Sequence, residues 1–204
     1  MRIKLTVAPT TEPISMSALT LHLRIDDDAM VENELLETIL KAAREVVEDN
    51  TRRALFTQTF EYYLQEWPSA RYIKLPFGNL QSITSVVYKP SDWETVADNE
   101  TLVENTDFVK ETNGEGLGSI VLLPNKYWPS DVLYPSNPIT ITFVCGWTTR
   151  ALIPSKVKTA IKMICADLYE NREWQAYSAV STSAYVLNKT VERLLLNARL
   201  WDEF

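Results

Sequence analysis

The spacing of apolar residues changes twice along this 204-residue chain, and that change constrains the fold more than any other feature. Up to residue 55 apolar residues recur at helical spacing, whereas over residues 56–147 they alternate or form short runs bounded by turns. Helical spacing returns after Pro154. Helices and strands that are segregated along a chain are typical of the α+β class. We therefore predict an α+β protein whose helical core is built from both ends of the chain, 1–55 and 148–204, with a β-rich subdomain inserted at 56–147.

The helical parts contain two long amphipathic segments. The first runs from about 28 to 53, and the second begins at Pro154, a favoured residue for the first turn of a helix, and ends near Glu173. Each has an apolar stripe with the spacing of a core-facing helix. Shorter helices are expected within 15–25 and around 190–198. The central part predicts strands at 56–64, 72–75, 81–88, 118–123 and 139–145.

The overall composition excludes several classes of protein. The chain carries 20 Lys and Arg against 27 Asp and Glu, a formal net charge of −7, which repels polyphosphate and argues against tight general DNA binding. Cys145 and Cys165 stand apart in apolar stretches, so we expect buried free thiols suited to a reducing cytoplasm. The chain lacks a signal-peptide pattern and any apolar run long enough for a membrane span, so we expect a soluble protein.

No group of residues has the pattern of a catalytic, cofactor or metal site. Gly114, Gly116 and Gly118 precede a strand instead of a helix, which predicts a hairpin turn and not a phosphate loop. The acidic run at 26–28 predicts a helix N-cap, and His22, the single histidine, has no recognisable nucleophile motif to work with. We therefore predict that the protein is not an enzyme and holds no cofactor.

Several segments carry a resemblance to a known family. The most specific are LHLRIDDD at 21–28, LYENRE at 168–173, and the pattern formed by Glu48, Thr51, Arg53, Ala54, Leu55 and Gln58. The stretches LPFGNLQSITSVVY, ITITFVCGW and IPSKVKTAIKMICADL lie between them in matching order. Over nearly its whole length the chain resembles the phage head-tail connector family, also called adaptor or head-completion proteins, in the longer form with a β insert.

The resemblance implies a structural subunit of a tailed bacteriophage or prophage particle. Such a subunit forms a homo-oligomeric ring of about twelve copies, docks on the portal after genome packaging, and extends the DNA channel. It offers an attachment platform to a tail-side stopper or tail-completion protein. DNA would pass through the lumen without tight binding, and no membrane would be involved. The protein would be found in the host cytoplasm during assembly and in the neck of the finished virion.

Two groups of residues are candidate partner interfaces. Lys156, Lys158 and Lys162 lie early in the helix after Pro154, against its dipole, and are expected to face acids of a neighbouring subunit. The apolar and aromatic stretch from Asn188 onward is expected to dock on the portal or an adjoining ring instead of packing in the subunit's own core. Its anchors would be Arg199, Leu200, Trp201 and Phe204. The alternative, that this stretch folds back onto the helix after Pro154, stays open.

Two other functions remain as alternatives. Trp93, Trp128 and Trp147 could form sugar platforms, so the β block could belong to a carbohydrate-binding or carbohydrate-active protein. Core or interface aromatics are the competing interpretation of the same residues. The chain could also be another neck or tail-completion subunit.

Overall fold

The computed structural model describes residues 2–25, 33–92, 94–171 and 188–200. The chain divides into two compact units. A β unit is formed by Met1–Thr10 and Phe56–Trp147, and a helical unit by Thr11–Leu55 and Thr148–Phe204. Helices and strands are thus segregated, and the predicted α+β class is confirmed.

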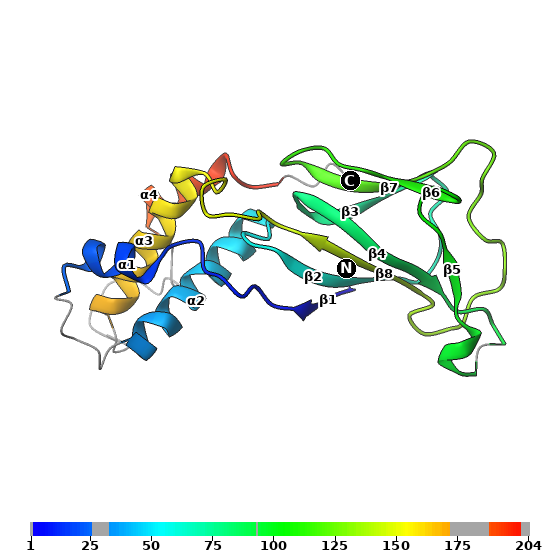
Figure 1. The fold of residues 1–204 in the computed structure, drawn as a ribbon, viewed down its shortest axis with the longest axis horizontal. Helices are drawn as coiled ribbons and strands as arrows, with labels where there is room; N and C mark the ends of the chain where they lie inside the picture. The colour runs from blue at the N-terminus through cyan, green and yellow to red at the C-terminus, as the bar shows by residue number, and fades with distance from the viewer. Residues whose placement is uncertain (1, 26–32, 93, 172–187, 201–204) are drawn as a thin grey trace, which may run out of the picture. The chain divides into compact units, whose positions relative to one another are not determined.

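The β unit contains two antiparallel sheets, drawn as two layers in Figure 1. The larger has the order β1-β2-β8-β4-β5 and the smaller β3-β7-β6. The strands of the larger sheet are β1 (Arg2–Val7), β2 (Gln58–Leu64), β8 (Ile139–Cys145), β4 (Leu80–Tyr88) and β5 (Glu100–Leu102). Those of the smaller are β3 (Tyr72–Gly78), β7 (Leu117–Leu122) and β6 (Phe108–Glu111), and a 3-10 turn, η2, spans Val96–Asp98.

The core of the β unit is aromatic and aliphatic because alternate residues of the strands face inward. Phe60 of β2 lies opposite Phe143 of β8, with their ring centroids 5.9 Å apart. The ring of Phe77, from β3 in the other sheet, lies 4.5 Å from that of Phe60. Phe143 is fully buried, together with Ile139, Ile141 and Cys145 of the same strand. These contacts join the two sheets into one core.

Two glycines of the β unit have a positive φ. Gly114 lies in the turn between β6 and β7 with a φ of 55°, and Asn113 donates its side-chain amide to the Leu117 carbonyl. This confirms the predicted hairpin turn. Gly146, directly after β8, has a φ of 108°, and its N–H donates to the Asn79 carbonyl at 3.1 Å. A Cβ there would lie 2.1 Å from the Phe56 carbonyl oxygen, so no side chain fits.

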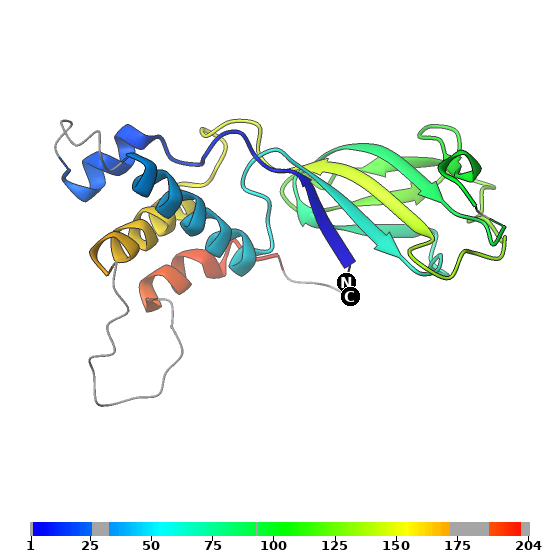
Figure 2. The same ribbon diagram turned by 90° about the horizontal axis from the view of Figure 1, so that it is seen from below.

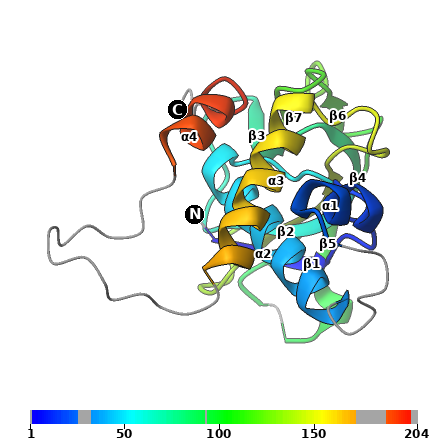
Figure 3. The ribbon, with the colours of Figure 1, turned by 90° about the vertical axis from the view of Figure 1, so that its left-hand side faces the viewer.

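The helical unit contains α1 (Met16–Leu23), α2 (Asn33–Thr51), α3 (Ser155–Glu170) and α4 (Lys189–Leu196). Ser15 caps α1 by accepting from the Ala18 N–H. α2, α3 and α4 pack against one another, as Figure 2 shows, and Figure 3 shows α3 between α1 and α4. Core residues include Leu19, Leu36, Ile39, Leu40, Ala43, Val47, Val157, Ala160, Ile161, Ile164, Cys165, Val191 and Leu195.

The structure corrects the predicted limits of the helical part. Residues 1–10 belong to the β unit because β1 pairs with β2 in register, with Leu5 opposite Phe60. Arg2–Val7 alternates strictly between polar and apolar residues, which is a strand pattern that the sequence analysis missed. The short strands β5 and β6 were missed as well. The acidic run at 26–28, the start of the predicted helix at 28–32 and Trp93 lie outside the described residues.

Candidate partner-binding site

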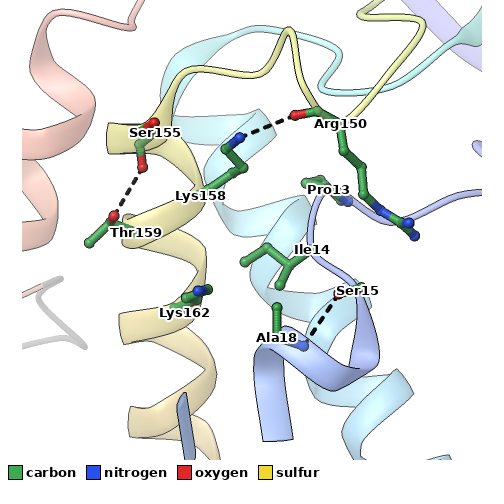
Figure 4. Close-up of a pocket in the computed structure, with 9 residues that line it drawn as sticks. All are labelled: Pro13, Ile14, Ser15, Ala18, Arg150, Ser155, Lys158, Thr159 and Lys162. Carbon is green, nitrogen blue, oxygen red and sulfur yellow. Dashed lines mark hydrogen bonds between the residues drawn. The ribbon is translucent and has the colours of Figure 1, made fainter. Parts of the chain in front are cut away.

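A pocket of about 370 Å³ lies between α1 and α3 in the helical unit (Figure 4). We call it the basic pocket because Arg150, Lys158 and Lys162 line it. Ile14 and Ser15 contribute from the start of α1, and Thr159 from α3. Two of the three lysines predicted from sequence therefore share one cavity. Lys156 is half-buried and does not line it.

The local sequence explains how the lysines reach the pocket. Pro154 is the N-cap residue of α3, and the stripe from Val157 to Cys165 is buried in the helical core. Lys158 and Lys162 are one turn apart and lie beside that stripe, so their stems are half-buried along the boundary with α1. Lys158 donates its ammonium to the Arg150 carbonyl at 3.2 Å, an interaction visible in Figure 4.

All charged residues in the described lining of the pocket are basic. Arg150 donates its Nε to the backbone carbonyl of Glu12 at 2.8 Å, so this contact, like that of Lys158, is to a neutral acceptor. Lys162 makes no hydrogen bond or ion pair within the described part of the chain. None of the described lining residues is acidic. The lysine side chains along this cavity, whose described lining includes no acid, favour the binding of a carboxylate or another small anion.

Opposite charge gathers on another helix of the same unit. Glu34, Glu37, Glu45 and Asp49 are exposed and recur at helical spacing along α2, and we call them the acidic stripe. Lys41, an exposed base, lies between Glu37 and Glu45 on the same face of α2. Glu45 has an ion pair with Arg44 at 3.4 Å, but the other three acids have none among the described residues.

The prediction that the stretch from Asn188 onward lies outside the subunit's own core needs a correction. Val191, Leu195, Ala198 and Leu200 are each at most 9% exposed, and α4 packs on α2 and α3. The Leu200 N–H donates to the Thr51 carbonyl at 2.9 Å. The stretch up to Leu200 therefore belongs to the subunit's own core, because its apolar side chains already have partners. Arg199 is exposed, while Trp201 and Phe204 lie outside the described residues.

A buried ionic cluster fixes α2 within the helical unit. Arg44 is 6% exposed and contacts Glu12 at 3.0 Å and Glu48 at 2.5 Å. Glu48 also accepts the Leu55 N–H at 2.8 Å, where the chain leaves α2. Sequence reasoning assigned no role to Arg44, because a basic residue on a mostly polar helix gives no sign of burial. The contacts of this cluster assign it a structural role.

The remaining candidates for chemistry are dispersed or buried. No group of His, Cys, Asp and Glu in the described residues is arranged to hold a metal ion. Cys165 is buried as predicted, and burial, with a smaller contribution from the charge of Glu12, raises the pKa of its thiol to about 12. His22 is exposed on α1. None of the helices in the described part combines the length and hydrophobicity needed to cross a membrane.

The tryptophans do not form an open platform in the described residues. Trp147 is 6% exposed. The ring of Trp128 stacks on that of Trp67 at 5.0 Å, and its Nε1 donates to the Ala70 carbonyl at 2.7 Å. Burial covers Trp147, and Trp67 covers one face of the Trp128 ring, so these residues do not form a shared open platform for a sugar.

Comparison with known proteins finds matches in structure alone. No protein-family model and no curated protein matches the sequence. A chain from the neck of an empty GTA particle, computed with C6 symmetry, matches with a TM-score of 0.75 and 18% identity, covering 100% of this chain and 98% of that chain. A chain from the virion of a native gene transfer agent (GTA) particle gives the same values. A third, from the neck of a native GTA particle computed with C12 symmetry, has a TM-score of 0.68, 17% identity and the same coverage. At these identities the matches establish a shared fold over the whole chain.

Proposed function

We propose that the protein is a structural subunit of the neck of a tailed phage or phage-like particle and that it forms a closed ring. The observation that supports this most is the full-length match in fold to chains of GTA particle necks. The C6 and C12 symmetries of those necks favour a ring in which the same two surfaces meet at every contact. A function that resides in surfaces also agrees with the dispersed chemistry of the described residues.

Within the neck we propose the adaptor role that the sequence resemblance implies. The ring of about twelve copies would dock on the portal, extend the DNA channel and receive a stopper or tail-completion protein. The formal charge of −7 favours a channel through which DNA passes without tight contacts. The main competing proposal is another neck or tail-completion subunit. The carbohydrate hypothesis gains no support from Trp128 and Trp147, whose rings are stacked or buried.

We expect the purified protein, alone or on portal, to form rings of about twelve subunits by negative-stain imaging and mass photometry. Co-purification with portal, against co-purification with tail tube, separates the adaptor role from a tail-completion role. A protein that stays monomeric at high concentration and in the presence of portal would contradict the ring. Rings that bind tail tube and ignore portal would contradict the adaptor role alone.

Two truncations separate docking from folding at the C-terminal side. Deleting 201–204 removes Trp201 and Phe204, and we expect an unchanged melting temperature, intact rings and failure to join portal-bearing heads. Deleting 199–204 also removes Leu200, which is 9% exposed, so unfolding should become easier by about 2 kcal/mol. Thermal unfolding and a head-completion assay measure the two effects. Heads completed normally by the shorter deletion would rule out docking through Trp201 and Phe204.

A further inference from the structure

The basic pocket contains positive charge that its own surroundings do not balance. Arg150 and Lys158 contact backbone carbonyls, Lys162 has no partner among the described residues, and the described lining includes no acid. The chain as a whole has an excess of acids. The positive charge of Lys158 and Lys162 in such a protein therefore calls for a counter-charge from outside the cavity.

The acidic stripe is the complementary surface on the same chain, but it faces away from the pocket's helix. Leu36, Ile39, Ala43 and Val47 are buried on the opposite side of α2, where α2 packs on α3. Since residues on opposite sides of a helix point in opposite directions, Glu34, Glu37, Glu45 and Asp49 point away from α3. The stripe therefore cannot fill the pocket of its own subunit.

We infer that the basic pocket receives carboxylates of the acidic stripe from the next copy of the chain. The inference rests on the proposed ring, in which two different faces of each subunit meet at every contact. Both faces belong to the helical unit, so the contact depends on that unit alone. The stripe extends from Glu34 to Asp49, about 22 Å along α2, and one turn of it presents Glu34 and Glu37 together.

The opposite charges contribute more to the specificity of this contact than to its affinity. Carboxylates inserted beside Lys158 and Lys162 would gain charge-assisted hydrogen bonds, whereas like charges there would repel. Because the lysines are half-buried, salt should weaken the contact without abolishing it. Complementary faces also set the direction in which subunits join.

The test uses two charge-reversed full-length proteins. K158E/K162E makes the pocket acidic, and E34K/E37K makes the stripe basic at one turn. Each alone should raise the concentration for half-assembly by on the order of tenfold or more, because like charges then meet at every contact. Mixed in equal amounts they should assemble again, since each contact in an alternating ring joins opposite charges. Mass photometry and negative-stain imaging report the rings, and circular dichroism checks that each variant is folded.

A matched control separates the effect of this contact on assembly from the effect of net charge. K189E/R193E makes the same change in charge on exposed residues of α4 and should assemble like the unmodified protein. Rings formed equally well by K158E/K162E, or a mixture that fails although both variants are folded, would overturn the inference. K158E/K162E rings that have merely lost affinity for DNA or phosphate would assign the pocket to those anions. An unmodified protein without rings would instead count against the proposed function.

Discussion

Replacing Gly146 with alanine is expected to destabilise the β unit strongly. The new Cβ would lie 2.1 Å from the Phe56 carbonyl oxygen, and the backbone φ of 108° is one that alanine rarely adopts. Movement away from Phe56 would also break the Gly146 N–H bond to Asn79 and the bond from Gln81 to the Gly146 carbonyl. We expect a loss of about 4 kcal/mol or more, a large part of the stability of a typical domain.

Urea unfolding followed by near-ultraviolet circular dichroism measures this loss, together with the soluble yield. Gly114→Ala is the matched control, because Gly114 also has a positive φ but no atom beyond its two chain neighbours lies within 4 Å of the place that a Cβ would take there. That control should cost only about 1 kcal/mol. Equal stabilities of the two variants would show that the backbone near Phe56 yields easily, contrary to our expectation.

Replacing Arg44 with methionine is expected to destabilise the helical unit by about 3 kcal/mol. Methionine keeps the apolar stem but leaves the carboxylates of Glu12 and Glu48 close together, with side chains only 19% and 14% exposed. Two poorly solvated charges without a counter-ion are costly, and this cost exceeds what the ion pairs themselves contribute. Thermal and urea unfolding monitored at the helical signal measure the change.

The Arg44 prediction has both a control and a rescue variant. Lys41→Met changes an exposed base on α2 and should shift stability by about 0.5 kcal/mol or less. Adding E12Q and E48Q to Arg44→Met should recover part of the loss, because the uncompensated charges disappear while the amide introduced by E48Q still offers an oxygen to the Leu55 N–H. A loss no larger than that of Lys41→Met would mean that solvent reaches the cluster freely.

The long elements were predictable because a repeated pattern specifies them. α2, α3 and the central strands follow from apolar spacing alone, and the observed α3 (Ser155–Glu170) lies inside the predicted range. The short strands β5 and β6 were not predictable, because three or four residues are too few to show an alternating pattern. β1 has a clear alternation, and it was missed because helix was expected throughout the N-terminal part.

The roles of Thr51 and Arg53, two of the residues that carry the family resemblance, could not be predicted, because their partners are distant in sequence. Arg53 donates to the Ala198 carbonyl across 145 positions, and Thr51 accepts the Leu200 N–H. These contacts tie the end of α2 to the segment that follows α4, so the two residues have structural roles. The basic pocket was only half predictable for the same reason: Lys158 and Lys162 were identified from one helix, whereas Arg150 and Ser15 come from separate segments.

The division of the helical unit by the β unit has a consequence for the order of synthesis. The ribosome makes α1 and α2 first, then the whole of Phe56–Trp147, and only afterwards α3. At roughly 5–20 residues per second, α2 waits on the order of 5–20 s for the helix that covers its apolar side. The β unit needs only segments made before α3, so it can close during this wait. The pocket between α1 and α3 is complete only after α3 has emerged, so a nascent chain cannot recruit neighbours through it before that point.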